Sequence, residues 1–104
     1  MQLQHPSPRC QTFPELKDFI YKTLCHREQL VVGAFPMTER LLRRGGTPCG
    51  VLFVVHGPRN VVFNAVWEMD RNNVLFYGSS GERFQTTRLT VAPRIAGSLL
   101  PLVA

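Results

Sequence analysis

The sequence predicts an α+β fold, in which one long and one short N-terminal helix pack on an antiparallel β-meander of three to five strands. Two observations carry this prediction. An amphipathic segment with a helix-start pattern occupies 13–28, and a run rich in apolar and β-branched residues extends from Gly50 to Val91. Two turn sequences, Pro58-Arg59 and Arg71-Asn72, divide that run into strands short enough for hairpins. Helices followed by strands in sequence are typical of the α+β class.

Length and composition indicate one globular domain. The chain has 104 residues, of which 44% are hydrophobic and 18% charged, close to the average for folded domains. We expect a disordered tail at 1–11, the α+β domain at 12–92, and a C-terminal tail at 93–104 that can pack on the sheet. No apolar run approaches the roughly 20 residues of a spanning helix, and no secretory signal pattern opens the chain. We therefore expect a cytoplasmic protein without membrane contact.

The first predicted helix has a clear start. Thr12 and Glu15 form a T-x-x-E capping box, and Pro14 is tolerated in the first turn because its missing N–H has no intrahelical partner there. Apolar and small side chains then recur at helical spacing. They are Phe13, Leu16, Phe19, Ile20, Thr23 and Leu24.

The segment after this helix is harder to assign. Residues 30–35 are β-branched and short, which fits either a further strand or an extended buried link. Thr38 then lies at a suitable position for a helix N-cap, and Gly45-Gly46 are typical of a helix C-terminus in the left-handed conformation. These observations predict a short second helix at 38–44.

The two turns also predict the register of the sheet. A two-residue turn at each position sets Leu52 opposite Ala65 and Trp67 opposite Phe76. Arg83 to Val91 alternates and is polar enough for a further strand at the sheet edge. In this register the predicted core face carries Leu52, Val54, Val61, Phe63, Ala65, Trp67, Met69, Val74 and Phe76.

The opposite face of the predicted sheet is too apolar to be left in water. Its candidate interaction residues are Val51, Phe53, Val55, Val62, Val66, Leu75 and Tyr77. The candidates that would cover this face are the C-terminal stretch, a second copy of the chain, or another protein. The face leads to our first functional hypothesis, a small non-enzymatic interaction module that binds a partner protein or itself.

The charge of the chain supports an alternative hypothesis. The formal charge is +5, and ten of the twelve basic residues are arginine, whose planar fork suits phosphate and carboxylate groups. Codon bias explains the same skew without function. The residues that would contact an anion or nucleic acid are Arg40, Arg43, Arg44, Arg59 and Arg71. Arg40, Arg43 and Arg44 would share one side of the short helix, so the alternative is a nucleic-acid-binding regulatory protein.

An enzyme is the third hypothesis, with a site near His56, Glu68 and Asp70. It has little support. The thiol–imidazole pair that such a site would use, Cys49 and His56, cannot form a catalytic dyad, because the two residues lie seven apart on one predicted strand. The three cysteines match no CxxC zinc pattern. We therefore expect no catalytic residue, no metal and no cofactor.

Overall fold

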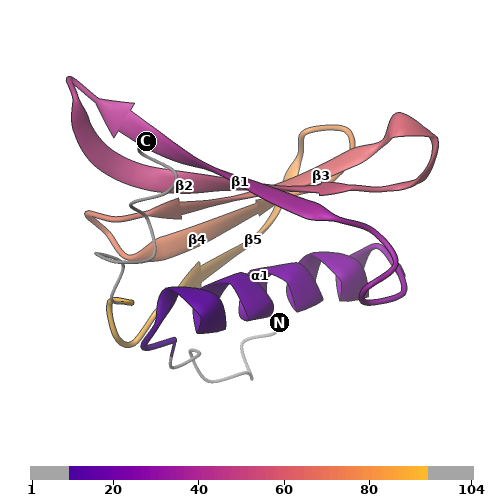
Figure 1. The fold of residues 1–104 in the computed structure, drawn as a ribbon, viewed down its shortest axis with the longest axis horizontal. Helices are drawn as coiled ribbons and strands as arrows, with labels where there is room; N and C mark the ends of the chain where they lie inside the picture. The colour runs from indigo at the N-terminus through magenta and orange to yellow at the C-terminus, as the bar shows by residue number, and fades with distance from the viewer. Residues whose placement is uncertain (1–9, 94–104) are drawn as a thin grey trace.

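The computed structural model describes residues 10–93, in which one α-helix packs on a five-stranded antiparallel sheet (Figure 1). The elements are α1 (Phe13–Arg27), β1 (Met37–Arg44), β2 (Thr47–His56), the 3-10 turn η2 (Pro58–Asn60), β3 (Val62–Glu68), β4 (Asn73–Tyr77) and β5 (Arg83–Arg88). The strands follow one another across the sheet in sequence order. The predicted α+β class and antiparallel sheet are confirmed. Of the predicted tails at 1–11 and 93–104, residues 1–9 and 94–104 lie outside the described residues.

The capping box predicted for the long helix is present. Thr12 Oγ1 accepts a hydrogen bond from the Glu15 N–H at 3.3 Å, and Glu15 Oε1 accepts one from the Thr12 N–H at 3.2 Å. The helix continues to Arg27, one residue short of the predicted end. Before it, Cys10 is buried in the core, and the Gln11 N–H donates to Glu15 Oε1. Cys10 and Gln11 of the predicted tail therefore contact the core and the first turn of α1.

The predicted second helix at 38–44 is wrong, because these residues form β1. Leucine and arginine favour helices, but an isolated helix of seven residues is marginal in water. The same residues as a strand pair with β2 along their whole length, with one irregularity between Leu42 and Arg43. Gly45 and Gly46, both at positive φ, form the tight turn between Arg44 and Thr47. They are thus the hairpin loop rather than a helix stop.

The segment 30–35, predicted as a strand or an extended link, is the loop between α1 and β1. The Tyr21 side chain holds it in place. Tyr21 Oη donates to the Phe35 carbonyl at 2.6 Å and accepts from the Gly33 N–H at 2.8 Å. Val31 and Val32 project from this loop with 71% and 53% of their surface exposed.

The predicted register between β2 and β3 is wrong by one residue. Ala65 pairs with Phe53 rather than with Leu52. The turn contains more than two residues, since Arg59 and Asn60 both adopt positive φ and the Gly57 N–H donates to the Val61 carbonyl at 2.8 Å. A one-residue slip moves every side chain of a strand to the other face. The face predicted for β2 is therefore inverted.

The second hairpin is shifted by two residues, so its side chains keep the predicted faces. Trp67 pairs with Val74 rather than with Phe76, which pairs with Ala65. Asn72, at positive φ, closes the turn and accepts a hydrogen bond from Trp67 Nε1 at 2.9 Å. The core prediction is confirmed for Phe63, Ala65, Trp67, Val74 and Phe76, which are buried, and it is wrong for β2.

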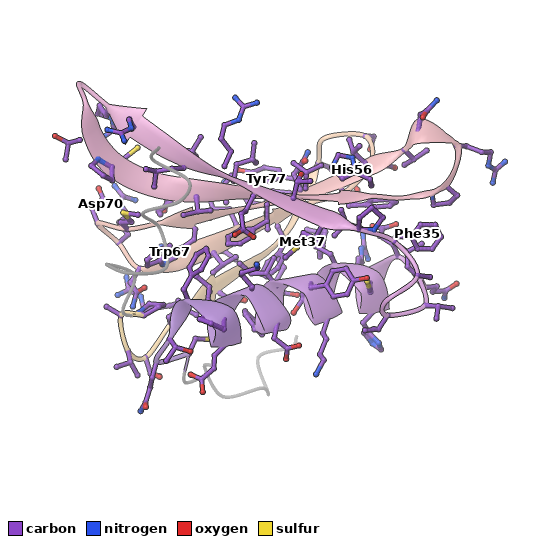
Figure 2. The ribbon with its side chains drawn as sticks, viewed as in Figure 1. Phe35, Met37, His56, Trp67, Asp70 and Tyr77 are labelled. Atoms are coloured by element: carbon purple, nitrogen blue, oxygen red, sulfur yellow. The ribbon has the colours of Figure 1, made fainter. Side chains whose placement is uncertain are left out.

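The core lies between α1 and one face of the sheet, called here the helix face. From α1 it receives Phe13, Leu16, Ile20, Leu24 and Cys25. From β1 and β2 it receives Leu41, Val51, Phe53 and Val55. Figure 2 shows Trp67 and Met37 between the sheet and the helix. Burial of these side chains supplies most of the driving force for folding.

Charged side chains fix the helix at both edges of the sheet. At the β1 edge, Lys17 Nζ lies 3.0 Å from Glu39 Oε1. At the β5 edge, the Arg27 guanidinium lies 4.5 Å from the centre of the Phe84 ring, a cation–π distance. A single helix thus spans the sheet from edge to edge because its long side chains reach outward on both flanks.

Candidate interaction surface

No described element covers the sheet face opposite α1, which is called here the open face (Figure 1). Residues paired across antiparallel strands share a face, so the register defines its members. They are Thr38, Arg40 and Leu42 on β1; Leu52, Val54 and His56 on β2; Val62, Asn64, Val66 and Glu68 on β3; Asn73, Leu75 and Tyr77 on β4; and Arg83, Thr86 and Arg88 on β5.

Six apolar or aromatic side chains, called here the apolar strip, form the middle of the open face. They are Leu42, Leu52, Val54, Val66, Leu75 and Tyr77, and each is half-buried by its neighbours on the sheet. Leu52, Val66 and Leu75 stand side by side on three successive strands. A contiguous apolar area on an exposed sheet is characteristic of a surface that another molecule covers.

Three exposed arginines, called here the rim arginines, border the apolar strip at the two edges of the sheet. Arg40 on β1 pairs with Leu52, while Arg83 and Arg88 on β5 pair with Tyr77 and Asn73. None of the ion pairs found among residues 10–93 involves them. Glu68 is the only acidic residue on the described open face. The face is therefore apolar in the centre and positively charged at its edges.

The residues predicted for the interaction face divide between the two sides of the sheet. Val51, Phe53 and Val55 are fully buried on the helix face, so they are not on the open face. Val62, Val66, Leu75 and Tyr77 lie on the open face as predicted. The inverted register of β2 explains the division, because it exchanges Val51, Phe53 and Val55 for Leu52 and Val54.

The predicted arginine cluster is also divided. Because Arg40, Arg43 and Arg44 belong to a strand, alternation places Arg40 and Arg43 on opposite faces: Arg40 lies on the open face, and Arg43 Nη1 donates to the Gly46 carbonyl at 3.1 Å. Arg44 is the last residue of β1, next to the β1–β2 turn. Arg71 lies in the β3–β4 turn, at the same end of the sheet as the β1–β2 turn. Arg59 lies in the β2–β3 turn at the other end. The structure does not gather the five into one phosphate-binding cluster.

The three residues of the enzyme hypothesis lie apart. His56, at the end of β2, shares a 2.9 Å hydrogen bond between its Nε2 and Thr38 Oγ1. Glu68 lies on the open face at the far end of β3, paired with Gly50 and Asn73. Asp70 lies in the following turn. Cys49, at the opposite end of β2 from His56, cannot approach it.

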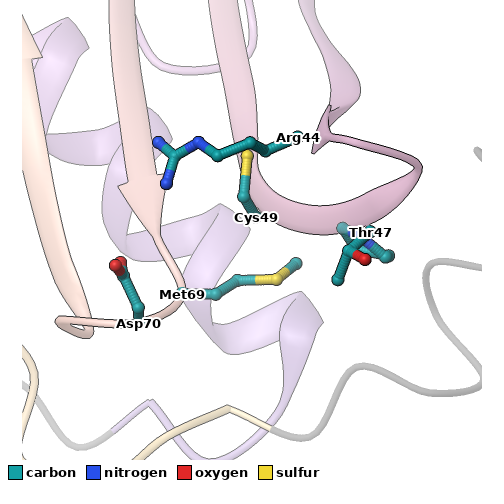
Figure 3. Close-up of a pocket in the computed structure, with 6 residues that line it drawn as sticks. Arg44, Thr47, Cys49, Met69 and Asp70 are labelled. Carbon is teal, nitrogen blue, oxygen red and sulfur yellow. The ribbon is translucent and has the colours of Figure 1, made fainter.

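A shallow hollow of about 400 Å³ lies between the β1–β2 hairpin and the β3–β4 turn (Figure 3). Its lining includes Arg44, Cys49, Met69 and Asp70. Cys49 is half-exposed in this hollow, and no histidine is among the lining residues. Among residues 10–93, no three His, Cys, Asp or Glu side chains are grouped closely enough to hold a metal ion.

Two ionisable groups outside the open face have shifted pKa values. Burial, together with the negative charges of Glu15 and Asp18, raises the pKa of the Cys10 thiol. Hydrogen bonding, chiefly from the Ser80 hydroxyl, lowers the pKa of the exposed Glu82 carboxyl in the β4–β5 loop. Both shifts stabilise the form that these groups have at neutral pH, the thiol of Cys10 and the carboxylate of Glu82.

Five members of the open face were not among the predicted interaction residues: Leu42, Leu52, Val54, Arg83 and Arg88. Leu42 was assigned to a helix, and Leu52 and Val54 were assigned to the core. The alternation of Arg83 to Arg88 already indicated an edge strand, which the structure confirms. Extending the strand pairing to that segment would have placed its arginines beside Tyr77 and Asn73.

Comparison with known proteins gives no assignment, since no family model, curated protein or solved structure matches the chain. Within the described part of the chain, α1 is too short and too polar to cross a bilayer, and no other helix there could do so.

Proposed function

We propose that this chain is a non-enzymatic interaction module that binds a partner protein through its open face. The observation that carries the proposal is the apolar strip, which no described residue covers. Burying apolar surface contributes roughly 25 cal/mol per Å², so even partial coverage of six such side chains favours association. A sheet face with this composition supports binding without requiring a reactive group.

Photo-crosslinking tests this proposal. A photoreactive amino acid replaces Val66, in the middle of the open face, and a control replaces Lys22, on the outer side of α1. In cells that express the chain, Val66 should yield one reproducible crosslinked protein, which is identified by mass spectrometry, purified and titrated. Crosslinks only at Lys22, or none at either position, would contradict the proposal.

Titration of the purified partner then locates the binding surface. Leu52→Asp places a charge in the apolar strip and should weaken binding by about tenfold or more, since 1.4 kcal/mol corresponds to a factor of ten. Val31→Asp is the matched control, because Val31 is an apolar residue that is 71% exposed and lies off the open face. Loss of binding in Val31→Asp with Leu52→Asp unaffected would assign binding to the α1–β1 loop instead.

A further inference from the structure

From the layout of the two faces, we propose that the partner presents an acidic amphipathic helix, which lies along the open face as α1 lies along the helix face. This inference rests on the proposed function and specifies the partner's chemistry. Its first support is the sheet itself, which already binds one amphipathic helix through an apolar centre and charged or aromatic groups at its edges.

The charges at the two faces of β1 are opposite. On the helix face, Glu39 receives Lys17 of α1 at 3.0 Å. On the open face, the next residue along the strand is Arg40, which has no acidic partner among the described ion pairs. A helix that docks on the open face therefore needs a carboxylate at the place where α1 carries Lys17. Charge complementarity at an interface favours the correct partner and repels others.

The β5 edge also requires carboxylates on a helix that docks on the open face. On the helix face, β5 presents the Phe84 ring to Arg27 of α1. On the open face it presents Arg83 and Arg88. Five strands spaced about 4.8 Å apart span roughly 19 Å, and α1 bridges that width with long side chains on both flanks. The partner helix should likewise carry Asp or Glu on both sides of its apolar stripe.

Other occupants fit the open face less well. In a homodimer formed through the open face, the three rim arginines and Glu68 of one copy would face the same four residues of the other copy. The chain's own residues 94–104 contain no acidic residue to match the rim arginines. A single-stranded nucleic acid prefers aromatic platforms for its bases, whereas the apolar strip is aliphatic except for Tyr77. An acidic helix satisfies both the aliphatic centre and the arginine edges.

A designed peptide pair tests the inference. Both peptides have 15 residues, the length of α1, and a leucine stripe at helical spacing; one carries glutamate on both flanks and the other lysine. Fluorescence anisotropy should show the glutamate peptide binding at least about tenfold more tightly than the lysine peptide. Raising the ionic strength from about 0.05 M to about 0.5 M should reduce this difference.

Charge reversal in the protein supplies the matched controls. Arg40→Glu and Arg88→Glu should each weaken the binding of the glutamate peptide and strengthen the binding of the lysine peptide. Arg59→Glu makes the same change in net charge in the exposed β2–β3 turn, at the other end of the sheet from Arg88. It should alter the binding of neither peptide by more than about twofold, because exposed charges separated by more than a Debye length are largely screened. Two separate rim positions keep the test valid if one variant folds poorly, as circular dichroism would show.

The outcomes separate this inference from the proposed function. Equal binding of both peptides, with loss in Leu52→Asp, would overturn the acidic helix and leave the open face as a binding surface. An equal effect of Arg59→Glu and Arg40→Glu would show that the charge preference is a general attraction to a basic protein, and it would overturn the inference. Tighter binding of a labelled single-stranded oligonucleotide, or a dimer that Arg40→Glu abolishes, would also overturn it.

Discussion

The two faces of the same sheet differ in how their side chains are used. On the helix face, Val51, Phe53 and Val55 are fully buried against α1. On the open face, their immediate neighbours Leu52 and Val54 are only half-buried. Acidic Glu39 is paired with Lys17 on one side, and basic Arg40 on the other side has no ion pair with a described residue. The fold is therefore stabilised through one face of the sheet, while no described element covers the other.

The largest difference between the two faces is expected when adjacent residues of β2 are truncated. Phe53→Ala should cost about 3–5 kcal/mol of unfolding free energy, because it leaves a cavity beside Phe13 in the core. Leu52→Ala, on the open face, should cost about 1 kcal/mol or less. Urea denaturation of both variants measures the difference. A larger loss for Leu52→Ala would show that β2 has the register predicted from the turn sequence, with Leu52 on the buried face.

A second prediction concerns the close contact between β2 and β3. A Cβ at Gly50 would lie 2.5 Å from the Trp67 carbonyl oxygen, so Gly50→Ala must push the strands apart. Overpacking of this kind costs about 1–3 kcal/mol. Thermal and urea denaturation report the loss, with Thr86→Ala on the exposed β5 edge as the control. An unchanged stability for Gly50→Ala would contradict the described approach of the two strands.

Removing the hydroxyl group of a tyrosine on each side of the sheet should have smaller effects on stability. Tyr21→Phe removes the hydroxyl that bonds Phe35 and Gly33, and it should cost about 1–2 kcal/mol because two hydrogen bonds are lost. Limited proteolysis should also become faster in the α1–β1 loop. Tyr77→Phe, on the open face, should change stability by less than about 0.5 kcal/mol. Equal losses would indicate that the Tyr77 hydroxyl has a partner comparable to that of Tyr21.

The smallest expected difference lies at the two faces of β1. Lys17→Ala removes a partly exposed ion pair with Glu39 and should cost between about 0.2 and 1 kcal/mol at low salt, with less effect at high salt. Arg40→Ala should leave stability unchanged within error, since Arg40 has no described ion pair. Denaturation at two salt concentrations measures both. A salt-sensitive loss for Arg40→Ala would reveal an acidic partner within the chain and remove the need for one on another protein.

Local sequence was sufficient where a short-range interaction decides the structure. The capping box at Thr12 and Glu15 satisfies backbone groups three residues apart, so the start of α1 was predictable. The apolar alternation of β3 and β4 also placed Phe63, Trp67 and Phe76 on the buried face. A two-residue error in the second hairpin did not change this result, because side chains alternate with a period of two.

The sequence by itself thus determined the α+β class, the long helix and the buried faces of two strands. Only the tertiary structure decided that 38–44 is a strand, because its pairing with β2 outweighs its local helix propensity. It also decided the face of β2, since one additional residue in the turn after His56 inverts every side chain of that strand. The open face and its rim arginines depend on both decisions, and they arise from contacts between residues far apart in the chain.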